Sequence, residues 1–208
     1  MDIQYLGLVD YALAWQRQRE SVQQVLVNRQ RESLLLCEHP SVLTLGRMAD
    51  RSHILWPQDE LDRRKVSVFD IDRGGEVTLH APGQLVVYPI LDLSRRGKNL
   101  HDYLHKLEQL GIDFLRHFGI MGERIPGKTG VWIGPRKIMS VGIGVRQWVS
   151  CHGISLNIHT DLSLFKMIRP CGMEIPMTSL KQETGRHIDL ETAAQYLVTI
   201  FQQLFGVS

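Results

Sequence analysis

The sequence predicts a single α+β domain in which helices flank a mostly antiparallel sheet. Apolar residues recur at helical spacing over about 11–28, 100–118 and 190–205. The segment from 131 to 158 instead contains short apolar strands joined by tight turns. No linker rich in Pro, Gly or Ser, no repeat and no low-complexity segment divides the 208 residues, so we expect one domain over residues 1–208.

The N-terminal part is predicted to contain one helix followed by two strands. The helix runs from about 11 to 28, with Asp10 as its N-cap. Its inward face is expected to carry Tyr11, Trp15, Val22, Val25 and Leu26. Apolar runs at 33–37 and 42–45 flank His39-Pro40, and they are predicted to be strands joined by a turn.

The middle of the chain is predicted to contain a helix followed by three strands. The helix runs from about 100 to 118, and Gly119 can take the left-handed conformation that closes it. Strands are predicted at 131–133, 138–145 and 149–158, with tight turns between them.

The last predicted helix runs from about 190 to 205, and Asp189 is its expected N-cap. Its apolar residues form one continuous stripe, as they do in the two earlier helices. Packing against a core explains all three stripes, so we assign them no chemistry.

Glycine is concentrated in the predicted sheet. Nine of the 18 glycines fall between Gly119 and Gly172. Glycine weakens strands, because it loses conformational entropy and contributes no packing side chain. Hairpin turns do not explain Gly142, Gly144 and Gly153, so we expect the backbone to approach another group closely there.

Composition excludes several classes of protein. Lys and Arg number 24 and Asp and Glu number 22, which gives a net charge of +2 and argues against a nucleic-acid binder. No apolar run is long enough to span a bilayer, and the N-terminus does not resemble a signal peptide. Three cysteines without a C-x-x-C pair indicate a reducing compartment, so we expect a cytoplasmic protein.

Two motif matches are rejected on their context. Residues 122–129 satisfy the P-loop pattern, but a helix precedes them and a strand follows, which is the reverse of the order that phosphate binding needs. His101 and His105 have a workable metal-ligand spacing on a helix, but no third ligand lies near them in the sequence. We therefore expect a solvated helix face and no metal site.

The context of Cys171 differs from that of the other two cysteines. Cys37 ends an apolar run and Cys151 lies in a predicted strand, as is typical of structural cysteines. Cys171 lies between a proline and a glycine, two residues after Arg169. A nearby cation lowers the pKa of a thiol and raises its reactive thiolate fraction. From the residues alone, Cys171 is either a nucleophile or an incidental turn cysteine.

Lys137 presents a similar choice. It follows a Gly-Pro turn and opens a long apolar strand. It is either a solvated lysine at a strand end or a partly buried one that stabilises a thiolate and moves protons.

Four short motifs occur in order along the chain. They are the stretches Arg73-Gly-Gly-Glu-Val-Thr-Leu-His80-Ala-Pro-Gly-Gln84, Lys137-Ile-Met-Ser-Val-Gly142, Cys151-His-Gly-Ile-Ser-Leu-Asn157 and Pro170-Cys-Gly172. Together they resemble the lipoyl(octanoyl) transferases, which belong with the lipoate and biotin protein ligases. The resemblance covers most of the chain up to about Thr178.

The resemblance implies a fold, a reaction and a set of site residues. It implies a domain of the biotin/lipoate protein ligase type, with Cys171 as the acyl-thioester nucleophile and Lys137 as its partner. The implied substrate-binding residues are Arg73, Gly74, Gly75, Glu76, Val77, Thr78, Leu79, His80, Ser140, Val141, Gly142, Gly153, Ile154 and Ser155. No metal and no cofactor is implied. The implied donor is octanoyl-acyl carrier protein, and the implied acceptors are lysines in lipoyl domains of 2-oxoacid dehydrogenases and in the glycine cleavage H protein.

Four residues depart from the family pattern. They are Leu79, Ala81, Val87 and Met139. We expect these departures to bear on the shape of the pocket and the preferred acyl length, and a positive φ at Ala81 would cost about 1 kcal/mol.

Two other functions remain open from the sequence. One is an ATP-dependent lipoate or biotin ligase of the same fold, which would not need Cys171. The other is a catalytically silent domain that binds an acyl group or a cofactor.

Overall fold

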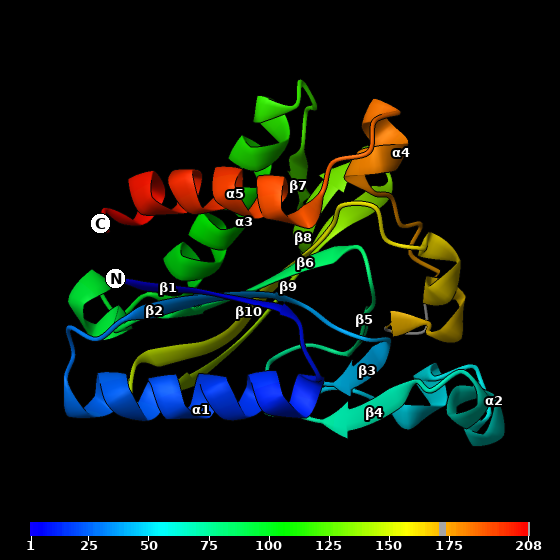
Figure 1. Cartoon of the computed structure of the whole chain (residues 1–208), viewed down its shortest axis with the longest axis horizontal. Helices are drawn as coiled ribbons and strands as arrows, with labels where there is room; N and C mark the ends of the chain where they lie inside the picture. The colour runs from blue at the N-terminus through cyan, green and yellow to red at the C-terminus, as the bar shows by residue number, and fades with distance from the viewer. Residues whose placement is uncertain (171–173, 208) are drawn as a thin grey trace.

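A seven-stranded mixed sheet forms the centre of the molecule (Figure 1). The structure is a computed structural model that describes residues 1–170 and 174–207. The strands of this sheet are β1 (Asp2–Leu8), β2 (Ser33–Glu38), β6 (Gln84–Ile90), β7 (Glu123–Ile125), β8 (Lys128–Ile133), β9 (Arg136–Arg146) and β10 (Val149–Asn157). Their order across the sheet is β1-β2-β6-β10-β9-β8-β7, and every neighbouring pair except β1 and β2 is antiparallel.

A second, three-stranded sheet lies at one end of the large one. It contains β3 (Val42–Leu45), β4 (Ser67–Asp70) and β5 (Val77–His80) in the order β4-β3-β5. Both strands predicted around His39-Pro40 are present, but they lie in different sheets and do not pair with each other. Strand β5 contains the end of the first predicted binding segment, and β3 and β4 precede that segment in the chain.

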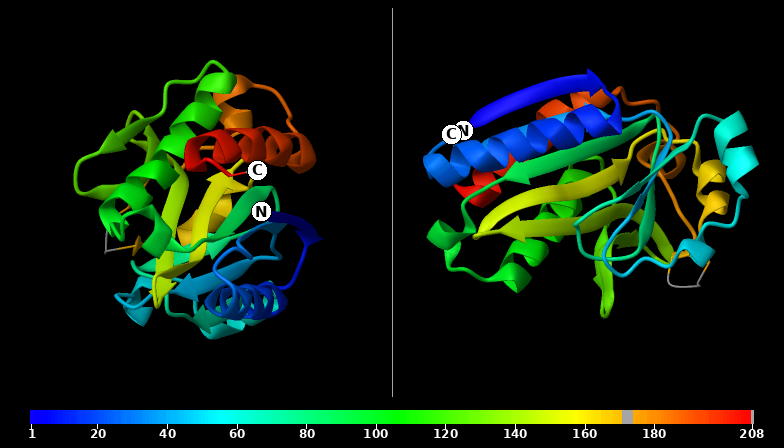
Figure 2. Two further views of the ribbon diagram at one scale, coloured as in Figure 1. Left: turned by 90° about the vertical axis from the view of Figure 1, so that its left-hand side faces the viewer. Right: turned by 90° about the horizontal axis from the view of Figure 1, so that it is seen from below.

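Helices cover both faces of the large sheet (Figure 2). The long helices are α1 (Tyr11–Val27), α3 (Leu100–His117) and α5 (Leu190–Phe205), and the short ones are α2 (Gln58–Arg63) and α4 (Leu180–Thr184). Helix α1 packs on one face, and α3 and α5 pack together on the other. The mixed α+β class predicted from the sequence is confirmed.

Side-chain alternation along the central strands explains the two-sided core. In β2, Leu34 and Leu36 pack toward α3 and α5, whereas Leu35 and Cys37 pack toward α1. Successive residues of a strand point to opposite faces, so an unbroken apolar run is what a strand covered on both sides requires. Each of these four side chains is almost fully buried.

The predicted helix ends are confirmed by their capping bonds. Asp10 accepts a hydrogen bond from the backbone N–H of Ala12 at 2.8 Å, and Asp189 accepts one from Thr192 at 2.7 Å. Gly119 has a φ of +75° after the end of α3. In the described part of the chain, no helix combines the length and apolar character needed to span a membrane.

Strands β9 and β10 form the hairpin that carries the second and third predicted motifs. They pair over eight consecutive residues, from Val149 opposite Arg146 to Leu156 opposite Met139. Gln147 and Trp148 form the connecting turn, and both have positive φ values, 48° and 65°. This is the twist that two-residue hairpin turns adopt to match the strands.

Candidate active site

The predicted motifs converge on one cavity at the end of the large sheet. We call it the outer cavity, and its volume is about 420 Å³. Its walls come from the loop before β5, the β7–β8 hairpin, the start of β9 and residues between 165 and 177. The predicted site residues that line it are Arg73, Gly75, Glu76, Val77, Thr78, Lys137, Ser140 and Val141.

A smaller cavity adjoins the first. This inner cavity has a volume of about 50 Å³ and shares four wall residues with the outer one. The predicted residues that line it are Arg73, Thr78, His80, Ser140, Val141, Gly142, Gly153, Ile154 and Ser155. The two cavities therefore form one path that leads from the protein surface to the crossing of β5, β9 and β10.

Lys137 stands in the outer cavity at the beginning of β9. Its backbone N–H donates to Pro176 O at 2.8 Å, and its carbonyl accepts from the Thr178 N–H at 2.9 Å. Residues 176–178 therefore run beside Lys137 as a short parallel bridge. This return segment brings the chain that follows the last motif alongside the predicted catalytic lysine.

The ammonium group of Lys137 is packed from two further sides. It lies 5.3 Å from the centre of the Trp132 ring, a distance at which the ring face attracts a cation. Gly130 faces its side chain, because a Cβ at that position would lie 2.5 Å from Lys137 Cε. The N–H of Gly130 in turn donates to the buried carboxylate of Glu108 at 2.9 Å. These contacts hold the lysine side chain in the cavity.

Cys171 lies outside the described residues, but the residues beside its segment do not. Pro170 and Glu174 both line the outer cavity. Arg169 Nη2 donates to Glu174 Oε1 at 3.1 Å, and the Arg169 N–H donates to His53 O at 2.9 Å. The residues on either side of segment 171–173 thus line the cavity that holds Lys137.

Arg73 lines both cavities. Its side chain is buried, and Nη2 donates to the backbone and hydroxyl oxygens of Thr44 at 2.7 and 3.0 Å. Burial lowers the pKa of this guanidinium to about 10, so it stays charged at neutral pH. Its Nε has no hydrogen-bond partner among the described residues. A buried donor of this kind can bind a carbonyl oxygen of a ligand.

A chain of hydrogen bonds joins two of the motifs to the return segment. The Gln84 side-chain amide donates to Asn157 Oδ1 at 2.9 Å, and its Oε1 accepts from His80 Nδ1 at 2.8 Å. Asn157 Nδ2 then donates to Thr178 O at 3.0 Å. The network therefore ties β5, β6 and β10 to the return segment beside Lys137. Sequence reasoning placed Gln84 and Asn157 in motifs but assigned them no role.

His80 is neutral in this environment. Burial is the main cause that lowers its pKa to about 3, and the neighbouring His39 is the second. Its ring stacks on Tyr11 of α1, with 6.1 Å between ring centres. Because Nδ1 donates to Gln84, the opposite nitrogen of His80 is an acceptor that faces the inner cavity.

The three unexplained glycines are sites of close approach within the protein. A Cβ on Gly142 would lie 2.9 Å from Arg73 Cδ, and one on Gly144 would lie 2.7 Å from Cys151 Sγ. A Cβ on Gly153 would overlap the carbonyl of Val87 on the neighbouring strand. The predicted close approach is confirmed, and its partners are protein groups.

Two predicted binding residues are not among the described residues that line either cavity. Leu79 is fully buried in the core of the small sheet, because alternation along β5 turns Thr78 and His80 toward the site and Leu79 away from it. Gly74 is exposed and donates its N–H to Ile143 O at 2.8 Å, which fastens the loop to β9.

The four departures from the family pattern also lie away from the described cavity walls. Leu79 and Ala81 pack in the core around the small sheet, and Val87 and Met139 pack in the core beneath α3 and α5. Ala81 is not among the described non-glycine residues with positive φ, so alanine causes no strain there. The departures alter core packing rather than the lining of the site.

The rejected P-loop match forms a wall of the outer cavity. Strands β7 and β8 form an antiparallel hairpin there, so the predicted absence of strand–loop–helix geometry is confirmed. Gly127, Lys128 and Thr129, at the turn of this hairpin, line the cavity. No sequence signal pointed to this role, since residues 127–129 lie outside the four motifs.

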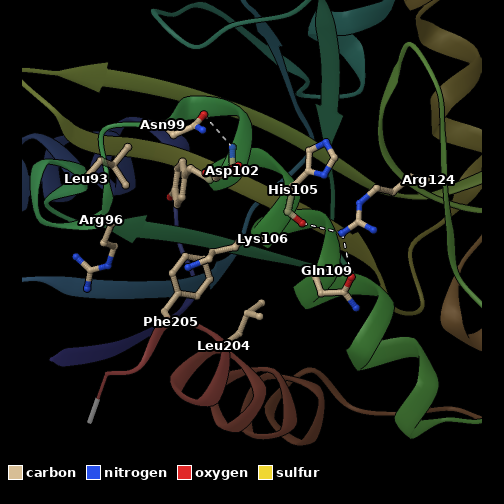
Figure 3. Close-up of a pocket in the computed structure, with 11 residues that line it drawn as sticks. Leu93, Arg96, Asn99, Asp102, His105, Lys106, Gln109, Arg124, Leu204 and Phe205 are labelled. Carbon is tan, nitrogen blue, oxygen red and sulfur yellow. Dashed lines mark hydrogen bonds between the residues drawn. The ribbon is translucent and has the colours of Figure 1, made fainter.

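A separate cavity of about 340 Å³ lies between α3 and the end of α5 (Figure 3). Arg124 lines this cavity and donates to His105 O and to the Gln109 side chain. His101 and His105 are both exposed on this helix. None of the predicted site residues lines this cavity among the described residues, so the motifs select the outer cavity instead.

Comparison with protein families gives a match over nearly the whole chain. The model of the lipoyl protein ligase A/B catalytic domain matches residues 10–202. This range includes all four motifs and the elements that build the two cavities.

Curated relatives are similar along most of their length. An octanoyltransferase of Gloeobacter violaceus is 45% identical over 202 residues, which cover 97% of this chain and 88% of the relative. An octanoyltransferase of Thermosynechococcus vestitus is 43% identical, with the same shares covered.

Solved structures share the fold at much lower sequence identity. A bipartite lipoate protein ligase from Thermoplasma acidophilum, studied with its E2 lipoyl domain, superposes with a TM-score of 0.75 and 14% identity. The match covers 100% of this chain and 84% of that one.

Proposed function

The chain belongs to the lipoyl protein ligase A/B catalytic domain family, and we propose that it transfers an octanoyl group from acyl carrier protein to a lysine through a thioester on Cys171. It is an octanoyltransferase of protein lipoylation, as relatives of that name are more than 40% identical over almost the whole chain. The observation that carries the proposed mechanism is the convergence of Lys137 and both flanks of segment 171–173 on one cavity.

In the first step, the Cys171 thiolate attacks the carbonyl carbon of the octanoyl thioester. A new S–C bond forms, the bond to the carrier's sulfur breaks, and the leaving thiolate takes a proton from the Lys137 ammonium, which leaves the Lys137 amine neutral for the second step. One thioester replaces another, so the exchange is nearly isoenergetic and needs no ATP. The Lys137 ammonium stabilises the thiolate before the attack.

In the second step, the ε-amine of an acceptor lysine attacks the enzyme-bound thioester. An amide bond forms, the S–C bond breaks, and the Cys171 thiolate is regenerated. The amine must lose a proton during this attack, and Lys137 is the group in the described cavity that we assign to accept it. The conversion of a thioester into an amide drives the cycle forward.

The cavity walls suit an unbranched acyl chain. Val77, Val141 and Ile168 contribute apolar surface to the outer cavity, and the glycines of β9 and β10 leave room beyond it. Each buried methylene contributes about 0.8 kcal/mol, so an eight-carbon chain gains several kcal/mol on binding. The Arg73 Nε lies beside this path as a donor for a carbonyl oxygen.

The acceptors are lipoyl domains, and we assign to them the lipoyl domains of 2-oxoacid dehydrogenases and the glycine cleavage H protein. The structural relative from Thermoplasma acidophilum was studied with an E2 lipoyl domain, which supports this class of acceptor. We place the reaction in the cytoplasm, because the described cysteines Cys37 and Cys151 are both free thiols.

The test is intact-mass measurement after incubation with octanoyl-acyl carrier protein in the absence of ATP. We expect one octanoyl adduct per chain, which Cys171→Ala abolishes and Cys151→Ala retains. Cys151 is a suitable control, because burial raises the pKa of its thiol to about 12 and leaves it protonated. Added lipoyl domain should then remove the adduct and gain the octanoyl group.

Two results would contradict the proposal. Modification of the lipoyl domain only when ATP is supplied, with no adduct on folded protein, would indicate an ATP-dependent ligase. An adduct that never passes to a lipoyl domain would indicate an acyl-binding domain without transferase activity.

A further inference from the structure

Three potential metal ligands meet near the turn of the β9–β10 hairpin. A carboxylate oxygen of Asp72, the sulfur of Cys151 and a ring nitrogen of His152 all lie within 4.8 Å of one another. His152 Nε2 and Asp72 Oδ1 are 2.8 Å apart. Spacing along the chain does not reveal this cluster, because Asp72 precedes His152 by 80 positions.

The backbone of β10 is distorted where the cluster forms. Consecutive residues of a strand normally point to opposite faces, so Cys151 and His152 would not share a site in a regular strand. His152 has a φ of +56°, which is unusual for a residue with a side chain. A Cβ on Gly144 would lie 2.7 Å from Cys151 Sγ and 3.2 Å from His152 Cδ2, so both side chains lie over this glycine.

Packing from α1 fixes this strained residue. The His152 N–H donates to Oε1 of the buried Gln18 at 2.8 Å. His152 itself is almost fully buried, whereas the side chain of Asp72 is 61% exposed. The cluster therefore has two ligands held by the strand and one at the surface, where an ion can enter.

We propose that Asp72, Cys151 and His152 form a Zn²⁺ site. A sulfur, an imidazole nitrogen and a carboxylate oxygen are the donors that zinc uses, whereas Mg²⁺ and Ca²⁺ require oxygen donors. Zinc ligands at about 2.0–2.3 Å from the metal lie about 3 to 4 Å from one another, which a small rotation of the exposed Asp72 side chain achieves. The fourth position is open to water or another ligand.

Binding changes the protonation of the cluster. The Cys151 thiol releases its proton to solvent as the S–Zn bond forms, and the proton that His152 Nε2 donates to Asp72 moves to Nδ1, so that Nε2 and the carboxylate can bind the ion. The thiolate and the carboxylate then balance the charge of the ion. Arg47, whose charge acts on both Asp72 and Cys151, opposes binding of a cation.

The site borders the acyl path without including the proposed nucleophile. His152 also lines the inner cavity, so an ion on its Nε2 would fix one wall of that cavity. The inference does not rest on the proposed mechanism, since the ligands do not include Cys171 or Lys137.

Cobalt(II) titration of the metal-free full-length chain tests the site. Bound Co²⁺ reports a thiolate ligand through a sulfur-to-metal charge-transfer band, and Zn²⁺ should displace it. We expect one Co²⁺ per chain with this band, lost in Cys151→Ser and kept in Cys171→Ser. Asp72→Ala should weaken Co²⁺ binding by about tenfold or more. Asp70→Ala is the matched control, because that exposed aspartate lies two residues away and outside the cluster.

Several outcomes would overturn the assignment. They are the absence of the band in the unmodified chain, a band that survives Cys151→Ser, and a band that disappears in Cys171→Ser. Equal affinities in Asp72→Ala and Asp70→Ala would do the same. The aspartate pair decides the matter if Cys151→Ser does not fold, since both aspartates are exposed.

Discussion

The side chain of Lys137 depends on a glycine that faces it. Gly130 has a φ of +127°, and a Cβ there would lie 2.5 Å from both Lys137 Cε and Met139 O. The neighbouring carbonyl belongs to the backbone of β9 and cannot move easily. Any larger residue at position 130 must therefore push the lysine out of its place over Trp132.

Gly130→Ala should lower the rate of octanoyl transfer by about 10- to 100-fold, because a shift of about 1 Å in a catalytic group has an effect of this size. Gly134→Ala is the control, since Gly134 also has a positive φ, +55°, but a Cβ there meets no atom within 4 Å. Strain at either glycine costs about 1 kcal/mol in unfolding free energy. Steady-state kinetics of both variants measure the effect on transfer, and denaturant unfolding measures the effect on stability. Equal activities would show that the contact with Lys137 does not matter.

His80 makes the stability of the fold depend on pH. Its pKa falls from 6.5 in the unfolded chain to about 3 in the folded one, and burial lowers the pKa of His39 in the same direction. The unfolded chain therefore binds more protons at mildly acidic pH. The free energy of unfolding is therefore highest above pH 6.5, where His80 is neutral in both states, and it decreases as the pH falls toward 3.

The free energy of unfolding should fall between about pH 6.5 and pH 4, and His80→Asn should reduce this slope. Asn can reproduce the donor at Nδ1 without titrating. Hydrogen bonds from Thr192 hold the pKa of Asp189 below the ordinary value of an aspartate, so Asp189 acts only at still lower pH. His101→Asn, on an exposed helix face, should leave the slope unchanged. An unaltered slope in His80→Asn would refute the assignment.

At the scale of elements, the site depends on the return segment beside β9. Residues 176–178 are held by backbone bonds to Lys137 and by the amide of Asn157. Asn157 is 1% exposed, and it also accepts from Gln84. One side chain thus connects a central strand to the segment beside Lys137, the proposed catalytic lysine.

Asn157→Ala should destabilise the fold and slow transfer together. It removes the partner of Thr178 O and leaves the Gln84 amide with only its 3.3 Å bond to Leu79 O, at a cost of about 1–3 kcal/mol for each buried group affected. Asn99→Ala is the comparison, since it removes the α3 N-cap far from the site and costs about 1 kcal/mol. We expect transfer to fall at least tenfold more in Asn157→Ala, measured at a temperature where both variants are folded. Similar losses of transfer would mean that Asn157 acts only through stability.

Elements with strong periodicity are predictable from this sequence, and those defined by distant partners are not. The three long helices follow from their apolar stripes and caps. Strand β6 is buried on both faces, so it has no alternation to detect, and it contains Pro89. Strand β1 pairs in parallel with β2, and α1 connects the two strands in the chain. No local sequence pattern specifies this pairing. Edge strands and sheet order depend on contacts that the sequence does not display.

The site was predictable to the extent that its motifs are contiguous. Thr78 and His80 face the path because strand alternation turns them toward it, and the same alternation removes Leu79 from it. The cavity wall formed by Gly127, Lys128 and Thr129 was not predictable, because it reaches the motifs only through the pairing of β8 with β9.

The whole molecule has a net charge of only +2, but a single exposed cation can still produce a positive potential beside the site. Lys128 is exposed on the hairpin turn beside the outer cavity, 5.6 Å from the centre of the Trp132 ring. The proposed donor is acyl carrier protein, and a cation beside the outer cavity would favour the approach of an acidic carrier.

Lys128→Glu should raise KM for octanoyl-acyl carrier protein by about fivefold, which is the size of one exposed ion pair. Lys106→Glu is the control, because Lys106 lines the separate cavity between α3 and α5. Salt should reduce the difference between Lys128→Glu and the unmodified chain, since it screens exposed charges. Identical KM values for the two variants would place carrier docking elsewhere.

The walls of the outer cavity come from residues as far apart as Met48 and Met177. Arg73 binds Thr44 across 29 positions, and Lys137 binds the return segment about 40 positions later. During synthesis on the ribosome, the lysine therefore lacks one of its supports until the chain beyond residue 178 has emerged. In refolding experiments, we therefore expect the recovery of acyl transfer to mark the completion of this long-range assembly rather than the earlier formation of the β9–β10 hairpin.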